Sequence, residues 1–161
     1  MAAEDGESPY TLHHELGALM MDKVGVVRSN AALRAALSGL ADLSERAQHI
    51  ALGERSRWAN QGLAFARQVR DMIVLGQVVA QSALERDECR GAHFKPEFQI
   101  QVPAGKFPGD PEYEAYRERW RANNERWLET TVAESTADGP KIHYEPVDLS
   151  VMTPTQPRDY R

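Results

Sequence analysis

The chain has 161 residues, of which 42% are hydrophobic and 27% are charged, a composition typical of one soluble domain. Its formal net charge of −5 argues against non-specific nucleic-acid binding, which needs a basic surface to displace counterions. No apolar run is long enough to span a bilayer, the acidic start is unlike a signal peptide, and a single cysteine cannot form an internal disulfide. We therefore expect a protein of the cytoplasmic side, in a reducing compartment.

Two amphipathic helices are predicted first. Ser8 followed by Pro9 is a helix start, because the hydroxyl can cap the helix and proline needs no hydrogen-bond partner at the first helical position. Ser29 with Asn30 marks the cap of a second helix, expected over residues 31–51. Apolar residues recur at helical steps in both: Leu12, Leu16, Leu19, Met20 and Val24, then Leu33, Leu37, Leu40, Leu43, Ala47 and Ile50.

A third and longest helix is predicted to begin at the cap Ser56 and to continue as far as Glu88. Its apolar stripe consists of Trp58, Phe65, Val69, Met72, Ile73, Val79, Ala83 and Leu84. None of the three helices can bury its stripe alone, and their connections are short. These features favour an antiparallel, spectrin-like three-helix bundle that ends in a loop, over residues 8–98.

The remaining third is expected to be less regular. Residues 99–126 contain an irregular segment and then a very polar helix that starts at Asp110 before a proline. Residues 127–148 favour a small β-hairpin, because β-branched residues prefer extended backbone and Gly139 follows an aspartate in a turn dipeptide. Residues 149–161 are expected to form an extended tail. The predicted fold class is mainly α.

The candidate catalytic and metal-binding residues do not converge. His13 and His14 are adjacent, so on a helix they point about 100° apart and cannot share a metal as an i, i+4 pair can. Cys89 lies between Glu88 and Arg90, and no Cys–His–Asn pattern supports it as a nucleophile. No glycine-rich phosphate loop occurs. We expect neither a catalytic residue nor a metal site in this segment.

One stretch has a composition that a purely structural segment does not need. Residues 87–94 gather two acids, an arginine, a histidine and an aromatic side chain around Gly91, which allows a left-handed turn. Arg90 and His93 would lie at the end of the third helix, where a cation offsets the partial negative charge. The alternative is that they dock against another domain or a ligand, and the residues by themselves leave both possibilities open.

Several motifs occur in order along the chain: Leu12–Gly17, Val26–Arg28, Trp58–Gln61, Asp87–Phe98, Trp127–Glu134, Asp138–Pro140, Tyr144–Asp148 and Pro157–Tyr160. Together they resemble the C-terminal helical domain of succinate dehydrogenase and fumarate reductase flavoprotein subunits, with residues 87–93 as its signature loop. The match runs from about Ser8 to Tyr160, and the order of the motifs is more specific than any one of them. Residues 99–126 depart from the family pattern, because the polar helix is inserted there.

The resemblance implies an oxidoreductase whose catalytic parts lie outside this segment. In the family an N-terminal domain binds FAD, a capping domain closes over the dicarboxylate, and electrons pass to an iron–sulfur subunit and a membrane quinone. The implied partners of this segment are therefore the FAD and capping domains, the iron–sulfur subunit and, indirectly, the membrane subunits. The implied location is peripheral, on the inner face of the plasma membrane, with residues 1–7 as a domain boundary.

For the residues of this segment, the resemblance implies that Arg90, His93 and Arg158 face the flavin domain. A cation there would stabilise the electron-rich flavin during its covalent attachment. FAD is expected in the full-length subunit and no cofactor in this segment alone. The isolated segment is expected to be inactive, and its exposed apolar surfaces favour self-association.

Two other interpretations remain open from the residues. The C-terminal domain of L-aspartate oxidase has the same kind of helices and a related Arg-Gly-His loop. A free-standing helical interaction module would need no flavin domain at all. The hairpin at Tyr144–Asp148 and the tail at Pro157–Tyr160 favour succinate dehydrogenase over aspartate oxidase.

Overall fold

The computed structural model describes residues 6–54, 56, 58–137 and 139–151. The elements follow in the order α1 (Pro9–Lys23), α2 (Asn30–Arg46), the 3-10 turn η1 (Ala47–His49), α3 (Gln61–Glu85), the 3-10 turn η2 (Pro96–Phe98), α4 (Pro111–Trp127), β1 (Glu129–Thr136) and β2 (Gly139–Pro146). The fold is mainly helical, as predicted. The chain divides between Glu85 and Arg86 into two units, so the segment that follows α3 groups with α4 and the hairpin.

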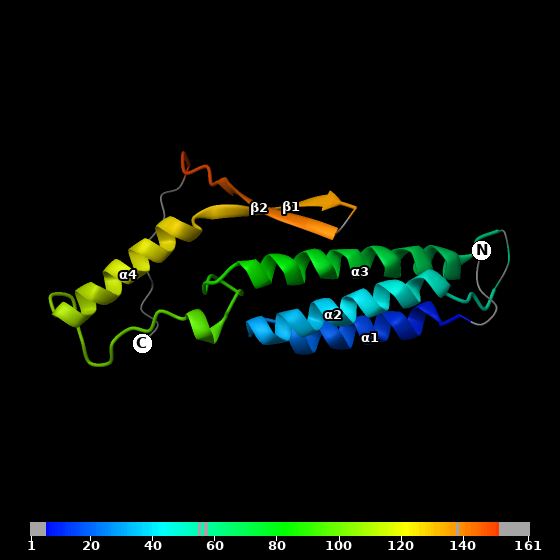
Figure 1. Ribbon diagram of the computed structural model, residues 1–161, viewed down its shortest axis with the longest axis horizontal. Helices are drawn as coiled ribbons and strands as arrows, with labels where there is room; N and C mark the ends of the chain where they lie inside the picture. Colours follow the sequence, from blue (N-terminus) through cyan, green and yellow to red (C-terminus); the bar gives the residue numbers. More distant parts are fainter. Residues whose placement is uncertain (1–5, 55, 57, 138, 152–161) are drawn as a thin grey trace. The chain divides into compact units, whose positions relative to one another are not determined.

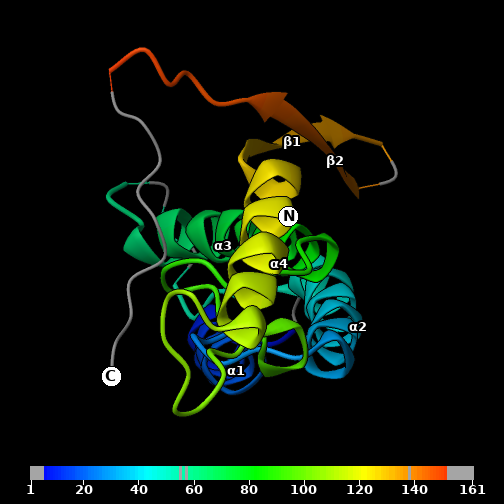
Figure 2. The same cartoon turned by 90° about the vertical axis from the view of Figure 1, so that its left-hand side faces the viewer.

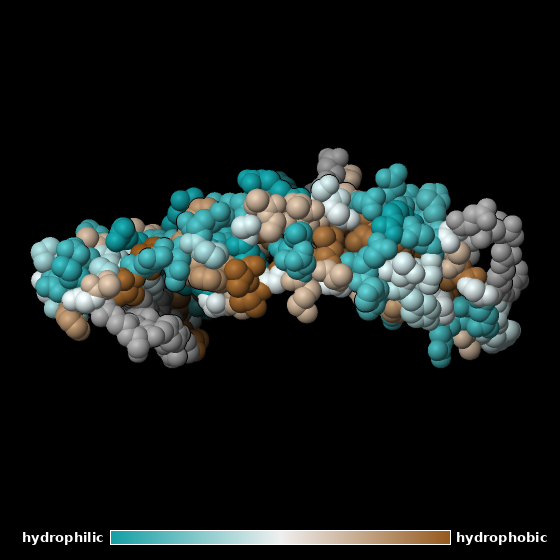
Figure 3. Space-filling model, turned by 90° about the horizontal axis from the view of Figure 1, so that it is seen from below, coloured by the Kyte–Doolittle hydropathy of each residue, from teal (hydrophilic) through white to brown (hydrophobic). Residues whose placement is uncertain are grey.

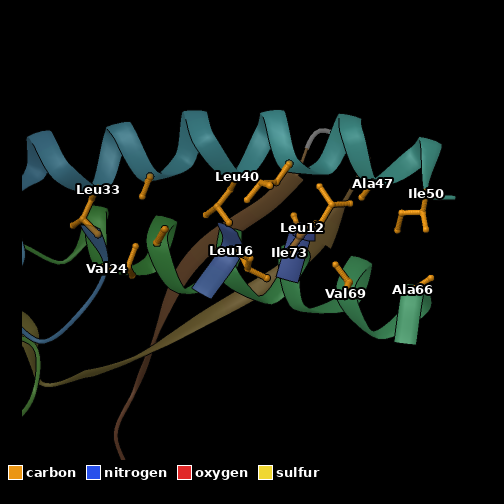
Figure 4. Close-up of a cluster of buried hydrophobic side chains, with 14 residues drawn as sticks. Leu12, Leu16, Val24, Leu33, Leu40, Ala47, Ile50, Ala66, Val69 and Ile73 are labelled. Atoms are coloured by element: carbon orange, nitrogen blue, oxygen red, sulfur yellow. The ribbon is translucent and has the colours of Figure 1, made fainter. Parts of the chain in front are cut away.

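The first unit is a three-helix bundle in which α1, α2 and α3 lie side by side and run in alternating directions (Figure 1). Its core fills the space between the helices (Figure 4). The buried residues are Leu12, Leu16, Val24, Leu33, Ala36, Leu40, Leu43, Ala47, Ile50, Ala66, Val69, Ile73, Ala80 and Ala83. The predicted stripes of the first two helices are confirmed, with Leu19, Met20 and Leu37 packed at the margin of the core.

The predicted starts of the first two helices are confirmed. The Ser8 hydroxyl accepts a hydrogen bond from the backbone N–H of Tyr10 at 3.3 Å, and Pro9 occupies the first helical position. The Ser29 hydroxyl accepts from the N–H of Ala32 at 3.1 Å. Each serine satisfies one of the backbone donors that a helix N-terminus leaves without an intrahelical partner.

The limits of the third helix were predicted wrongly. The helix starts at Gln61, where the Asn60 side chain accepts from the N–H of Leu63 at 2.9 Å and so acts as the cap in place of Ser56. Trp58 therefore precedes the helix, and 88% of its surface is exposed. The helix also ends at Glu85, three residues before the predicted end.

The predicted stripe of α3 is confirmed except at Trp58 and Val79, and small residues that were not predicted also line the core-facing side. The confirmed residues are Val69, Ile73 and Ala83, which are buried, and Phe65, Met72 and Leu84, which pack against the core. Ala66, Gly76 and Ala80 are buried, whereas Val79 is 45% exposed. A Cβ on Gly76 would lie 3.0 Å from Cδ2 of Leu40. A helix can approach its neighbours this closely only where its side chains are small, and periodicity that counts large apolar residues misses these small ones.

The second helix ends at Arg46 and is followed by η1, which shortens the predicted span by five residues. Beyond η1 the chain turns extended. Glu7 and Ile50 form a parallel bridge, with hydrogen bonds of 3.2 Å from the N–H of Glu7 to the carbonyl of His49 and 2.9 Å from the N–H of Ala51 to the carbonyl of Glu7. The segment before α1 is thereby hydrogen-bonded to the end of η1 and the residues that follow it.

The second unit contains α4 and the hairpin, and both were predicted. Figure 2 shows α4 running into β1, with β2 returning beside it. The strands pair antiparallel from Glu129 opposite Pro146 to Thr136 opposite Gly139. Gly139 has φ +111°, a value that suits glycine. The expectation for Asp138 and for the tail from residue 152 lies outside the described residues.

The polar helix α4 begins after Asp110, as predicted, and lies against the rest of its unit by its aromatic side chains. Tyr116 and Trp127 are 4% and 6% exposed, and Trp127 makes an edge contact with Tyr144 of β2 at 5.8 Å. The charged residues of α4 lie mainly in solvent. Figure 3 shows one face of the molecule, on which hydrophobic residues appear as separate patches among hydrophilic ones.

Candidate functional site

The signature loop is a small, closed structure. Arg90 and His93 exchange two backbone hydrogen bonds of 2.9 Å each, around a two-residue turn at Gly91 and Ala92. Gly91 has φ +56°, so the predicted left-handed turn is confirmed. A positive φ at the first central residue alone is typical of a type II′ hairpin turn. The turn does not end a helix, because α3 stops at Glu85, and the predicted placement of Arg90 and His93 at a helix end was wrong.

A buried carboxylate, that of Glu88, lies at the base of this loop with none of its surface exposed. It accepts from Nε of Arg86 at 2.6 Å, from Nε of Arg90 at 3.0 Å and from the side-chain amide of Asn123 at 3.4 Å. We call these three residues, with Glu88 itself and Asn124, the Glu88 cluster. Burying a carboxylate is unfavourable unless it is paired and hydrogen-bonded, and both conditions are met here.

Arg86 connects the loop to the other elements of its unit. Its Nη1 donates to the carbonyl of Glu129 and to the hydroxyl of Thr131, each at 3.0 Å, and its Nη2 donates to the carbonyl of Trp127. The guanidinium also lies over the Trp127 ring, 5.5 Å from its centre. Arg86 therefore satisfies carbonyl groups at the end of α4 and the start of β1, while it neutralises Glu88.

Arg90 is the cation of the cluster that reaches solvent, with 41% of its side chain exposed. Its Nε donates to Glu88, and its Nη2 donates to Oδ1 of Asn124 on α4 at 3.0 Å. Its Nη1 has no hydrogen-bond partner among the described residues. The cluster carries two guanidinium groups against one carboxylate, so it presents a positive charge and free N–H donors at Arg90.

His93 was predicted beside Arg90 as a residue that faces the flavin domain, and it lies in the same loop. Its Nε2 donates to the carbonyl of Arg86 at 2.8 Å, and the ring is half-buried. This bond closes the loop on its own base. The third predicted position, Arg158, lies outside the described residues.

A second buried charge, Lys95, stabilises the same loop. Its ammonium group has no exposed surface and pairs with Asp87 at 2.9 Å. The Cys89 thiol donates to the carbonyl of Lys95 at 3.1 Å, and burial raises the pKa of that thiol. A raised pKa lowers the fraction of the thiol that is present as thiolate at neutral pH.

The two adjacent histidines lie in the first unit and were not predicted to bind a metal. His13 makes an edge contact with Phe65 at 5.4 Å, and His14 is exposed. Among the described residues, no group of three or more His, Cys, Asp or Glu side chains is placed to hold a metal ion. None of the described helices is both long and apolar enough to cross a membrane.

Sequence reasoning identified the loop but missed Arg86, Asn123 and Asn124. One signal was available: Arg86, Glu88 and Arg90 are spaced two residues apart, which places side chains on one side of an extended backbone. No comparable signal marks the two asparagines, because they are more than 30 positions away along the chain.

Comparisons with known proteins extend over nearly the whole chain. The family model described as "Fumarate reductase flavoprotein C-term" matches residues 13–160. The chain is 36% identical to the succinate dehydrogenase flavoprotein subunit of Bacillus subtilis, over 99% of this chain and 24% of that protein. It is 27% identical to the fumarate reductase flavoprotein subunit of Haemophilus influenzae, over 95% of this chain and 22% of that protein.

Solved structures show the same fold. A quinol fumarate reductase chain of Escherichia coli superimposes with a TM-score of 0.72 at 23% identity, over 96% of this chain and 23% of that one, and shows likeness of fold. Mycobacterium smegmatis Sdh1 superimposes with a TM-score of 0.71 at 26% identity, over 92% of this chain and 22% of that one.

The chain thus spans about a quarter of the length of the curated relatives it matches. These matches favour neither aspartate oxidase nor a free-standing helical module. Because the family model covers residues 13–160 and a relative shares 36% identity, the chain belongs to the family of C-terminal domains of succinate dehydrogenase and fumarate reductase flavoprotein subunits.

Proposed function

We propose that the chain is the supporting helical domain of an FAD-dependent flavoprotein subunit that interconverts succinate and fumarate and exchanges electrons with a quinone through an iron–sulfur subunit. The observation that carries this proposal is the family match over residues 13–160, with relatives about four times as long. In this role the domain packs against the FAD and capping domains and supports the interface with the iron–sulfur subunit. The complex would lie peripherally, on the inner face of the plasma membrane, with the membrane quinone subunits as indirect partners.

Arg90 is the residue that we propose contacts the flavin domain. Its backbone lies in a tight turn, its Nε and Nη2 are held within its own unit, and its Nη1 has no partner among the described residues. A cation presented in this way is suited to donate to carbonyl, carboxylate or flavin oxygen acceptors of a neighbouring domain. His93 then acts by closing the loop, since its Nε2 is bonded to the carbonyl of Arg86.

We propose further that the segment carries no catalysis by itself. The groups of the Glu88 cluster hold one another, and the pKa of the Cys89 thiol is raised. FAD would be bound by the N-terminal part of the full-length subunit. The purified 161-residue chain should therefore show no flavin absorbance after incubation with FAD and no succinate oxidation with an artificial acceptor. Flavin binding at micromolar affinity would refute this part of the proposal.

The contact at Arg90 is tested in the full-length subunit. Arg90→Gln should lower the fraction of covalently attached flavin and the yield of complex with the iron–sulfur subunit, because an N–H donor and a positive charge are lost from the interface. Arg121→Gln is the matched control, since Arg121 is exposed on α4, has no side-chain hydrogen bond or ion pair among the described residues, and loses the same charge. If both variants retain full flavin content and assembly, Arg90 does not face the flavin domain.

A further inference from the structure

We propose that the inserted helix α4 fixes the position of the Arg90 side chain. In this arrangement, which we call the brace, Asn124 and Glu88 are both positioning residues for the Arg90 guanidinium. The family resemblance assigns no role to residues 99–126, where this helix lies. The inference deepens the proposed function, because it explains how Arg90 is held ready for the flavin domain. It rests on contacts inside the second unit alone.

Glu88 holds the inner side of the Arg90 side chain. The Arg90 Nε donates to both oxygens of Glu88, at 3.0 and 3.1 Å. The carboxylate is fully buried and is held from its other side by Arg86 at 2.6 Å. The Glu88 carboxylate is therefore held in place when the Arg90 side chain moves. It fixes the direction in which the Arg90 guanidinium points out of the loop.

Two asparagines of α4 contact the ion pair of Glu88 and Arg90. Asn123 and Asn124 are adjacent, and neighbouring residues on a helix point in directions about 100° apart. One amide donates to Glu88 at 3.4 Å, while the other accepts from Arg90 at 3.0 Å. The two asparagines thus hold the carboxylate and the guanidinium of one ion pair from a single turn of α4. Both lie in the last two turns of the helix, where the partial negative charge of the C-terminus favours cations.

The Nη1 group of Arg90 remains available to a partner, whereas its Nε and Nη2 groups are bonded within the unit. The backbone of Arg90 is fixed by the turn at Gly91, and two of its three side-chain nitrogens are bonded. A long arginine side chain ordinarily loses rotamer freedom when it binds a partner. Here that loss has already occurred in the free domain, so the exposed Nη1 edge is preorganised for an acceptor.

The inference is tested on the 161-residue chain by ¹⁵N NMR of the arginine side chains. Asn124→Ala should accelerate hydrogen exchange at the Arg90 Nη2–H groups by about tenfold, the effect expected for loss of one hydrogen bond to a charged group. Asn124→Asp retains the acceptor oxygen and adds a negative charge, so it should slow exchange below the rate of the parent chain. The Arg121 signal serves as the internal control and should not change. An Arg90 signal that is the same in Asn124→Ala and in the parent chain overturns the inference.

A second variant keeps the test decisive if Asn124→Ala disturbs the fold, which the amide signals of the hairpin would report. In Asn124→Asp the bond to Arg90 becomes an ion pair, so exchange at Nη2–H should be slower than in the parent chain. Exchange that is unchanged or faster in this variant also overturns the inference.

Flavin content in the full-length subunit separates this inference from the proposed function. Asn124→Ala could both accelerate hydrogen exchange at Arg90 and lower the covalent flavin content, while Asn124→Asp reverses both effects. This result supports the brace and the flavin contact together. If Asn124→Ala accelerates hydrogen exchange at Arg90 while the covalent flavin content is unchanged, the brace is supported and the flavin contact of Arg90 is refuted.

Discussion

The two units of this chain are stabilised in opposite ways. In the described part of the chain, all fourteen residues of the apolar core lie in the first unit, whereas both fully buried charged residues, Glu88 and Lys95, lie in the second. The second unit buries two large apolar side chains, Tyr116 and Trp127. Apolar burial is non-directional, while a buried ion pair contributes only when its geometry is right. The bundle should therefore tolerate polar changes that the second unit does not.

The largest effect is expected from Arg86→Met. This change leaves the buried Glu88 with one guanidinium fewer and removes the donors to Trp127, Glu129 and Thr131. Breaking a buried ion pair from one side typically costs about 3–5 kcal/mol. The loss should appear in the second unit, as faster hydrogen exchange of the hairpin amides.

Cys89 is a convenient second reporter for the same variant. It is the single cysteine of the chain, and its thiol is part-buried with a raised pKa. Its alkylation should be slow in the parent chain and much faster in Arg86→Met. Arg121→Met, which removes an exposed arginine of α4, should leave the rate unchanged. Equal alkylation rates in all three proteins would contradict the idea that charge pairing stabilises the second unit.

The matching change in the first unit is Leu40→Ala. Leu40 has no exposed surface and lies against Gly76 of α3, so its truncation leaves a cavity. Such changes typically cost about 2–5 kcal/mol. The bundle amides should exchange faster, while the exposed Leu75→Ala should change stability by about 0.5 kcal/mol or less. If Leu40→Ala has no larger effect than Leu75→Ala, the core is not where the bundle gains its stability.

Two glycines test how closely the helices of the bundle approach. Gly17 lies within α1, and a Cβ there would meet no atom within 4 Å, so Gly17→Ala should raise stability by about 0.5–1 kcal/mol. At Gly76 a Cβ would lie 3.0 Å from Leu40 and 3.3 Å from Met20, whose side chains must move. Gly76→Ala should therefore gain less or lose stability. Thermal unfolding compares the two, and an equal gain at both positions would contradict the close approach.

The smallest effect is a dependence on pH at the start of the bundle. Hydrogen bonds from Arg46, 2.6 and 2.7 Å long, hold the pKa of Glu7 below its usual 4.5. A lowered pKa in the folded state stabilises the fold above pH 4.5, and this contribution is lost as the pH falls through the lowered value. Because 40% of the Glu7 side chain is exposed, solvent screens the pair and the change should be slight. Glu7→Gln should flatten the acid side of a plot of melting temperature against pH. An unchanged slope would show that the ion pair of Glu7 and Arg46 does not contribute to this pH dependence.

Local signals in the sequence determined most of the secondary structure. Helical periodicity located α1, α2 and most of α3, and the side chains of Ser8 and Ser29 marked two helix starts, because a cap acts on backbone groups only two or three residues away. Alternation and β-branched residues located the hairpin. The motif order identified the family, which the match over residues 13–160 confirmed.

Tertiary structure alone decided which residues are buried and which charges meet. Trp58 and Val79 fit the helical pattern but are exposed, because α3 packs through Ala66, Gly76 and Ala80. The donors of Arg86 reach acceptors 41 to 45 positions away, and periodicity within one segment contains no information about such distant pairs. The sequence by itself therefore determined the elements and the family. The buried Glu88 cluster, and with it the direction of Arg90, arises only when the loop, α4 and β1 pack together.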